Sequence, residues 1–308
     1  MASNLSPLLD KVSEKRLGAT VSRLAQAPRH PSTSPAGHAA SQHIVTEALR
    51  EAGLHVSRQP FASGALKGVN LLARQEGSGH RLPPLLVTAH YDTVPGSPGA
   101  DDNASSIAAL LECARVLFTT RLPRRVEYAA FDLEELQVTG EGLLGSSAYV
   151  RQAGKGYAAV FNLEMVGYTS GPGTQRFPPG FQALFSDVHR WAAARDFRGD
   201  SLVIVCQGAS APWAARFQAA AGAHVPDLPV VVLALPPGTP VPSDVFRSDH
   251  AVFWAAGIPA VLLTDTANFR NPHYHTPADR PDTLDYQFLE RVTRALVATV
   301  AIHAGLGE

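Results

Sequence analysis

Imidazole and carboxylate side chains cluster in residues 85–111, LLVTAHYDTVPGSPGADDNASSIAALL. His90 and Asp92 follow an apolar run, and Asp102 follows a loop that is rich in proline and glycine. Imidazole nitrogen and carboxylate oxygen are donors that zinc and similar divalent ions bind, so this stretch permits metal chemistry. Taken alone, the pattern fits a capped helix after an ordinary loop equally well, because Asp and Asn are common helix N-caps.

Carboxylates also end two later apolar segments. Glu134 and Glu135 follow residues 126–132, and Glu164 follows residues 158–163. Short apolar runs of this kind indicate buried β-strands. In an open α/β sheet, ligands bind outside the carboxyl ends of the strands, so strands that deliver ligand-type residues there converge on one place. The sequence therefore predicts a site at one edge of a sheet.

A further histidine, His275, lies in the polar loop 271–276. Two imidazoles and several carboxylates suit zinc or a similar ion and contain too much nitrogen for a dedicated magnesium or calcium site. Five ligands are more than one zinc ion needs, whereas two ions that share a carboxylate would use all five. The candidate residues are His90, Asp92, Asp102, Glu134, Glu135, Glu164 and His275.

The rest of the chain alternates between helical and strand-like patterns. Apolar residues recur at helical spacing in 5–24, 38–52, 181–194, 211–221 and 286–303, and strand-like runs occupy 56–61, 68–74, 201–206, 229–235 and 260–264. This alternation predicts an α/β fold with a twisted, mostly parallel sheet and helices on both faces. The sequence shows neither an internal repeat nor a long linker, so residues 1–308 are expected to form a single domain.

Composition narrows the possible partners. The 308 residues are 45% hydrophobic and carry a formal net charge of -1, which gives no reason to expect nucleic acid or an anionic membrane as a partner. The apolar tracts are shorter than a membrane span, and residues 1–29 lack the apolar block of a secretory signal. A cytoplasmic location is therefore favoured, with secretion left open. Cys113 and Cys206 are expected to be buried free thiols.

The candidate residues and their neighbours resemble the co-catalytic zinc exopeptidases, which include bacterial leucine aminopeptidases, glutamate carboxypeptidase II and glutaminyl cyclases. Each matching motif is weak alone, but together, in the family's order, they are specific. The motifs are HYD at 90–92, GADDNAS at 99–105, FDLEE at 131–135, NLEMVG at 162–167, SDH at 248–250 and YHTP at 274–277.

The resemblance implies a role for each candidate. His90 and Glu164 would hold one zinc ion. Glu135 and His275 would hold a second ion, and Asp102 would bridge the two.

The resemblance also implies a reaction. Glu134 would be the general base for a metal-bridged hydroxide, and Asp92 would orient the neighbouring imidazole. The expected activity is removal of N-terminal residues from peptides or other aminoacyl substrates. The matched motifs contain no Arg or Lys to bind a substrate carboxylate, which favours an aminopeptidase over a carboxypeptidase. Nothing in the sequence indicates the oligomeric state.

Two features depart from the family's usual pattern. Glu164 stands where many relatives have Asp, and an extra stretch, 136–141, separates the paired glutamates from the Gly-Leu-Leu-Gly-Ser tract at 142–146. Longer stretches at this point also resemble the cyclases, so a glutaminyl cyclase reaction with one zinc ion is the main alternative. A non-catalytic relative is disfavoured because every ligand position and the base are present.

Three residues near the motifs have less defined roles. Asp101 is expected to be a cap or turn residue and not a ligand. His250 and His273 lie close enough to the motifs that substrate contact is left open.

Overall fold

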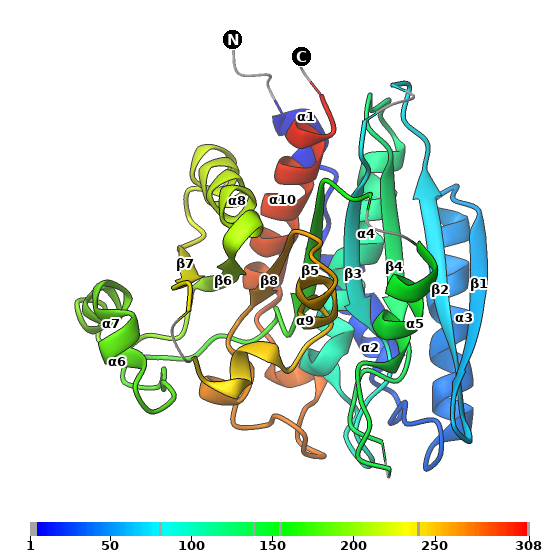
Figure 1. The fold of residues 1–308 in the computed structure, drawn as a ribbon, viewed down its shortest axis with the longest axis horizontal. Helices are drawn as coiled ribbons and strands as arrows, with labels where there is room; N and C mark the ends of the chain where they lie inside the picture. The colour runs from blue at the N-terminus through cyan, green and yellow to red at the C-terminus, as the bar shows by residue number, and fades with distance from the viewer. Residues whose placement is uncertain (1–4, 80–81, 138, 154–155, 239–240, 307–308) are drawn as a thin grey trace.

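The computed structural model describes residues 5–79, 82–137, 139–153, 156–238 and 241–306. These residues form one eight-stranded sheet in the order β1-β2-β4-β3-β5-β8-β6-β7, with helices on both faces (Figure 1). The strands are β1 Val56–Ser63, β2 Leu66–Gln75, β3 Leu85–His90, β4 Val126–Phe131, β5 Ala159–Glu164, β6 Leu202–Gln207, β7 Val230–Leu235 and β8 Ala260–Thr264. The helices are α1 Ser6–Leu9, α2 Glu14–Leu24, α3 Pro35–Glu51, α4 Ser106–Phe118, α5 Leu144–Ala153, α6 Phe181–Leu184, α7 Ser186–Ala193, α8 Ala211–His224, α9 His250–Ala255 and α10 Tyr286–His303.

The centre of the sheet is parallel and its borders are mixed. Strands β4, β3, β5 and β8 run parallel to one another, and β6 and β7 are also a parallel pair. The β1–β2, β2–β4 and β6–β8 pairs are antiparallel. The expected α/β fold with a mostly parallel, mixed sheet is therefore confirmed.

Side chains of the central strands alternate between two apolar layers because successive residues of a strand point to opposite faces. On one face, Leu85 and Val87 belong to the main core with residues of α2, α3, α4, α8 and α10. On the other face, Leu86 packs in a smaller cluster with Tyr149 of α5 and Phe253 of α9. Burial on both faces explains why these strands are continuous apolar runs.

Some predicted helix boundaries differ from the observed ones. The helix expected to begin at residue 38 begins at Pro35, a residue that is well suited to the first turn because it needs no intrahelical N–H bond. The helix expected at 181–194 is two short helices, α6 and α7, which separate at Phe185 (φ -130°, ψ 52°). The pattern in residues 5–24 fits either one helix or two short ones, and the structure has two, α1 and α2.

Two smaller expectations can be compared with the structure. Cys113 and Cys206 are buried free thiols, as expected. Within the described residues, every helix is too short or too polar to cross a bilayer.

Candidate metal centre

The predicted site residues gather where the central parallel strands end. His90 is the last residue of β3, and Glu164 is the last residue of β5. Glu134 and Glu135 follow the end of β4, which pairs with β3. Parallel neighbours present their carboxyl ends at the same edge of a sheet, and this edge lies toward the bottom of Figure 1.

Asp102 lies between the two imidazoles. Its Oδ1 is 3.3 Å from His90 Nε2, and its Oδ2 is 3.1 Å from His275 Nε2. His90 Nε2 is also 3.3 Å from Glu164 Oε1, and His275 Nε2 is 3.3 Å from Glu135 Oε1. The side chains thus form two groups of three that share one carboxylate.

The donor atoms of these groups fit divalent ions. His90, Asp102 and Glu164 offer atoms that lie within 4.8 Å of one another, and so do Asp102, Glu135 and His275. The buried atoms Asp102 Oδ1 and Glu135 Oε1 make no hydrogen bond. Buried polar atoms are nearly always satisfied, and a metal ion at each group would satisfy these oxygens.

Glu134 belongs to a third possible group, with His90 and Glu135. Its Oε2 is 3.8 Å from His90 Nε2, which is further away than either Asp102 or Glu164. Glu134 is therefore close to the centre without completing either group around Asp102.

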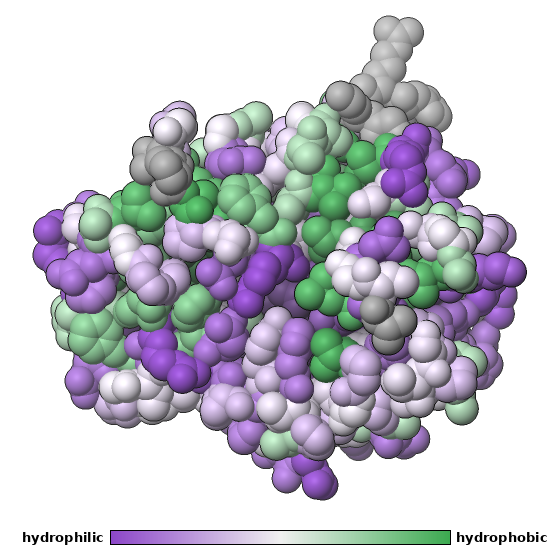
Figure 2. Space-filling model, turned by 60° about the horizontal axis from the view of Figure 1, so that its bottom comes forward, coloured by the Kyte–Doolittle hydropathy of each residue, from purple (hydrophilic) through white to green (hydrophobic). Residues whose placement is uncertain are grey.

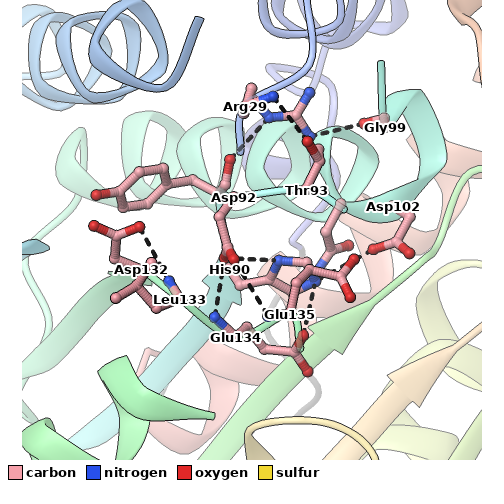
Figure 3. Close-up of polar contacts among 12 residues, drawn as sticks. Arg29, His90, Asp92, Thr93, Gly99, Asp102, Asp132, Leu133, Glu134 and Glu135 are labelled. Atoms are coloured by element: carbon pink, nitrogen blue, oxygen red, sulfur yellow. Dashed lines mark hydrogen bonds and ion pairs between the residues drawn. The ribbon is translucent and has the colours of Figure 1, made fainter. Parts of the chain in front are cut away.

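Asp92 orients more than the neighbouring histidine. Its Oδ1 lies 3.4 Å from His90 Nδ1 and accepts a hydrogen bond of 3.1 Å from the backbone N–H of Glu134. Its Oδ2 accepts a 3.2 Å hydrogen bond from the backbone N–H of Glu135. Figure 3 shows Asp92 between the imidazole and the two glutamates, so one carboxylate fixes the ends of both β3 and β4.

Glu164 is held by side chains from other motifs. Ser248 Oγ donates a 2.8 Å hydrogen bond to Glu164 Oε2, and Asn103 Nδ2 lies 3.4 Å from the same oxygen. Asn162 donates to Ser248 Oγ. These contacts give the SDH motif and the Asn of NLEMVG a place in orienting the longer glutamate ligand.

Burial and mutual repulsion perturb the carboxylates. Burial, together with the negative charges of Glu164 and Asp249, raises the pKa of Glu134 well above its ordinary value. Burial and the charge of Asp102 raise the pKa of Glu135 to about 7. A raised pKa is typical of a carboxylate that must accept and return a proton near neutral pH.

The pKa values of the two imidazoles are also raised, although burial acts against them. Burial lowers the pKa of His90, but Glu164 and Glu134 outweigh it and raise the pKa well above 6.5. Burial also opposes the charged form of His275, whose contacts with Asp102 and Glu135 raise its pKa to about 10. An imidazole binds a metal ion in its neutral form, so ion binding competes with protonation of these two rings.

Asp101 has a structural role, but its side chain links distant segments and is not the local cap or turn residue that was expected. Its Oδ1 accepts a 2.9 Å hydrogen bond from Gly167 N, and its Oδ2 accepts a 2.7 Å hydrogen bond from Asn271 Nδ2. His250 is fully buried, and its Nε2 lies 2.9 Å from the carbonyl of Val245, so it is not placed for substrate contact. 

Two further residues lie at the site, and neither was assigned a role from the sequence. Asp249 is buried beside the site, its oxygens make no hydrogen bond, and burial raises its pKa to about 7. Tyr274 stacks on His275 with ring centroids 3.7 Å apart. Both lie inside matched motifs, SDH and YHTP, which were the only signal in the sequence.

A pocket extends from the metal centre along β6, β7 and β8, beneath α6 and α7. Glu134, Glu164 and His275 line its polar end. Figure 2 shows a hollow on this side of the molecule, with strongly hydrophilic residues in it and hydrophobic residues beside it. The apolar lining includes Phe181, Trp191, Val203, Val205, Val231 and Leu262.

The same pocket contains cations that lie outside the motifs. Arg176, Arg198 and Arg247 line it. The Arg247 guanidinium is 3.4 Å from Asp244 and donates a hydrogen bond to Asn268. Although the motifs contain no Arg or Lys, the pocket lining therefore includes guanidinium groups, which are side chains of the kind that bind a substrate carboxylate.

Comparison with known proteins places the chain in a family. Residues 70–197 and 233–300 match the model of Peptidase family M28. The YfbL protein of Escherichia coli (strain K12) is 31% identical over 83% of this chain and 78% of its own length. Aminopeptidase YwaD of Bacillus subtilis (strain 168) is 29% identical over 82% of this chain. The match covers 49% of the length of YwaD. The chain belongs to peptidase family M28.

Solved structures share the fold. BSAP, a zinc aminopeptidase from Bacillus subtilis, superposes with a TM-score of 0.72 at 18% identity and covers 95% of each chain. An aminopeptidase from Aneurinibacillus sp. strain AM-1 gives 0.68 at 16% identity, covering 96% of this chain and 94% of its own. Porphyromonas gingivalis glutaminyl cyclase gives 0.71 at 21% identity, covering 96% and 99%. At these identities, the likeness shows the fold alone.

Proposed function

We propose that the protein is a zinc-dependent aminopeptidase that removes N-terminal residues from peptides. The observation that carries the proposal is the position of Asp102, with one carboxylate oxygen toward His90 and the other toward His275. A shared carboxylate between two ligand groups is typical of hydrolytic sites with two metals. The aminopeptidase names of YwaD and of BSAP support the same activity.

The residues present would hold two zinc ions per chain. His90, Asp102 and Glu164 would bind one ion, and Asp102, Glu135 and His275 would bind the other. Bound zinc supplies Lewis acidity, which polarises the scissile carbonyl and makes water a nucleophile near neutral pH.

We also propose that residues 1–308 are one domain, since all strands of the described residues share a single sheet.

The chain's own residues would move the proton. Glu134 is buried, carries a raised pKa and lies beside the ligand groups without completing them. Its carboxylate would take a proton from the attacking water and return it to the nitrogen of the leaving amine. Asp92 would hold Glu134 in place by accepting a hydrogen bond from the backbone N–H of Glu134.

The pocket would select the substrate. Carboxylates at its polar end would bind the free amino group of a peptide, because opposite charges attract each other most strongly where water is largely excluded. The apolar part beneath α6 and α7 would receive the side chain of the N-terminal residue.

The test is a panel of substrates applied to protein whose metal content is measured. We expect two zinc ions per chain and hydrolysis of aminoacyl anilides with a free amine, with protein stripped by a chelator as the inactive control. One ion per chain with release of a cyclised product would favour the cyclase. Cleavage only of N-blocked peptides that end in a free carboxylate would overturn the aminopeptidase in favour of a carboxypeptidase. Arg247 would then be expected to bind that carboxylate.

A further inference from the structure

Asp102 is not held by a regular helix or strand. It lies in the segment Ala100–Ser105, where the backbone at Asp102 (φ -101°, ψ 88°) and Asn103 (φ -133°, ψ 36°) departs from helical values. Its carboxylate must nonetheless reach both imidazoles. Contacts from elsewhere in the chain must therefore fix this segment.

Arg29 holds the part of the chain that leads to Asp102. Its side chain is buried, Nε donates a 2.8 Å hydrogen bond to the carbonyl of Tyr91, and Nη2 donates one of 2.9 Å to the carbonyl of Gly99. Nη1 donates to the carbonyl of Pro98. One guanidinium thus connects the residue after His90 to the residues just before Asp102, as Figure 3 shows for Gly99.

Gly99 allows this close approach. Its φ of +62° favours glycine, and a Cβ added there would lie 2.1 Å from the carbonyl oxygen of Asp102 and 2.9 Å from Arg29 Nη2. Any side chain at this position would push the guanidinium and the Asp102 backbone apart.

Asp279 holds Asp102 from the other side. Its Oδ2 accepts a 3.0 Å hydrogen bond from the backbone N–H of Asp102, and its Oδ1 accepts one of 2.9 Å from Asp101. Its own carbonyl accepts a 3.1 Å hydrogen bond from Ala100 N. Asp279 is buried and follows His275 in the same loop, so it connects the backbone of Asp102 to the second imidazole.

We propose that Arg29 and Asp279, named here the Asp102 clamp, are positioning residues of the metal centre. Arg29 fixes Asp102 relative to His90, and Asp279 fixes it relative to His275. The proposal rests on the metal centre of the proposed function. A carboxylate that serves two ions must satisfy two geometries at once, so small displacements of its backbone weaken metal binding.

The test is titration of zinc ions into metal-stripped protein carrying Asp279→Asn. The amide keeps the size of the carboxylate, but its NH2 group faces one of the two backbone N–H donors. We expect the dissociation constant for zinc to rise by about 10- to 100-fold, the range for residues that orient ligands. With cobalt(II) as the probe, the visible absorption band should also change, because it reports ligand geometry.

Asp285→Asn is the matched control. Asp285 accepts a 2.8 Å hydrogen bond from Phe288 N at the start of α10 and a 2.9 Å hydrogen bond from Thr169 Oγ1. The substitution removes the same chemical group from a backbone contact away from the metal ligands. We expect reduced stability, with zinc affinity and the cobalt spectrum unchanged.

Arg29→Lys provides an independent variant. Lysine keeps the charge, but its single ammonium group cannot reproduce the fork that spans Tyr91 and Gly99, so zinc affinity should again fall. If wild-type protein binds no zinc, the proposed function itself is wrong. If wild-type protein binds zinc and both clamp variants bind it equally well, or the control loses as much affinity, only the clamp is wrong. Failure of both clamp variants to fold, judged by circular dichroism, would assign them to the fold and overturn the positioning role.

Discussion

Replacement of Glu134 by glutamine removes a proton acceptor while preserving the shape of the site. The residue is 7% exposed, and its backbone N–H donates a hydrogen bond to Asp92 that does not depend on the side chain. An amide of the same size cannot take a proton from water. General acid–base catalysis contributes roughly 10²- to 10⁴-fold, so turnover should fall by that factor, equivalent to a barrier increase of about 3 to 5 kcal/mol.

The metal content of this variant should not change. Glu134 Oε2 is 3.8 Å from His90 Nε2, and the two groups that share Asp102 do not include Glu134. The assay is the initial rate of aminoacyl anilide hydrolysis together with elemental analysis of the same sample. Glu141→Gln is the control, since Glu141 is an exposed acid in the following loop. Wild-type turnover in Glu134→Gln would remove this residue from the mechanism, and loss of a metal ion would make it a ligand instead.

Three further outcomes are expected from single substitutions. His90→Ala and His275→Ala should each lower the zinc content by one ion per chain, and loss of both ions in either variant would show that the two groups do not bind separately. Burial opposes the charge of His38, but its hydrogen bond to Asp132 outweighs this and raises the pKa above 6.5. The free energy of unfolding in urea should be higher for wild type than for His38→Gln, most of all below pH 6.5. This difference should disappear as the pH rises past the raised pKa of His38, and a difference that is independent of pH would contradict the prediction. Val205→Trp should fill the apolar pocket and reduce kcat/KM for a phenylalanyl anilide about 10-fold or more relative to an alanyl anilide. The reason is that each methylene in such a pocket is worth about 1 to 3 kcal/mol. Equal effects on both anilides would place the side chain of the substrate's N-terminal residue elsewhere.

The sequence was sufficient to predict the sheet because burial leaves a direct trace in residue type. Strands β3, β4 and β5 are covered on both faces, so each is an apolar run that ends where the polar site begins. The position of His90 and Glu164 at strand ends therefore predicted their convergence. The long helix α10 begins at Tyr286 and ends at His303 as predicted, and Asp285 caps its start by accepting a hydrogen bond from Phe288 N.

Only the tertiary structure decided which residues support the site. Arg29 contacts Gly99 across 70 positions, and Asp279 contacts Asp102 across 177, yet neither residue differs in type from an ordinary surface charge. The arginines of the pocket also lie outside every motif, so nothing in the local sequence marks them as part of the site. Local patterns report the face of a helix or strand to which a side chain belongs, whereas contacts between distant segments depend on how the whole sheet and its loops pack. The sequence thus determined the chemistry available at the sheet edge, and packing determined which side chains surround Asp102.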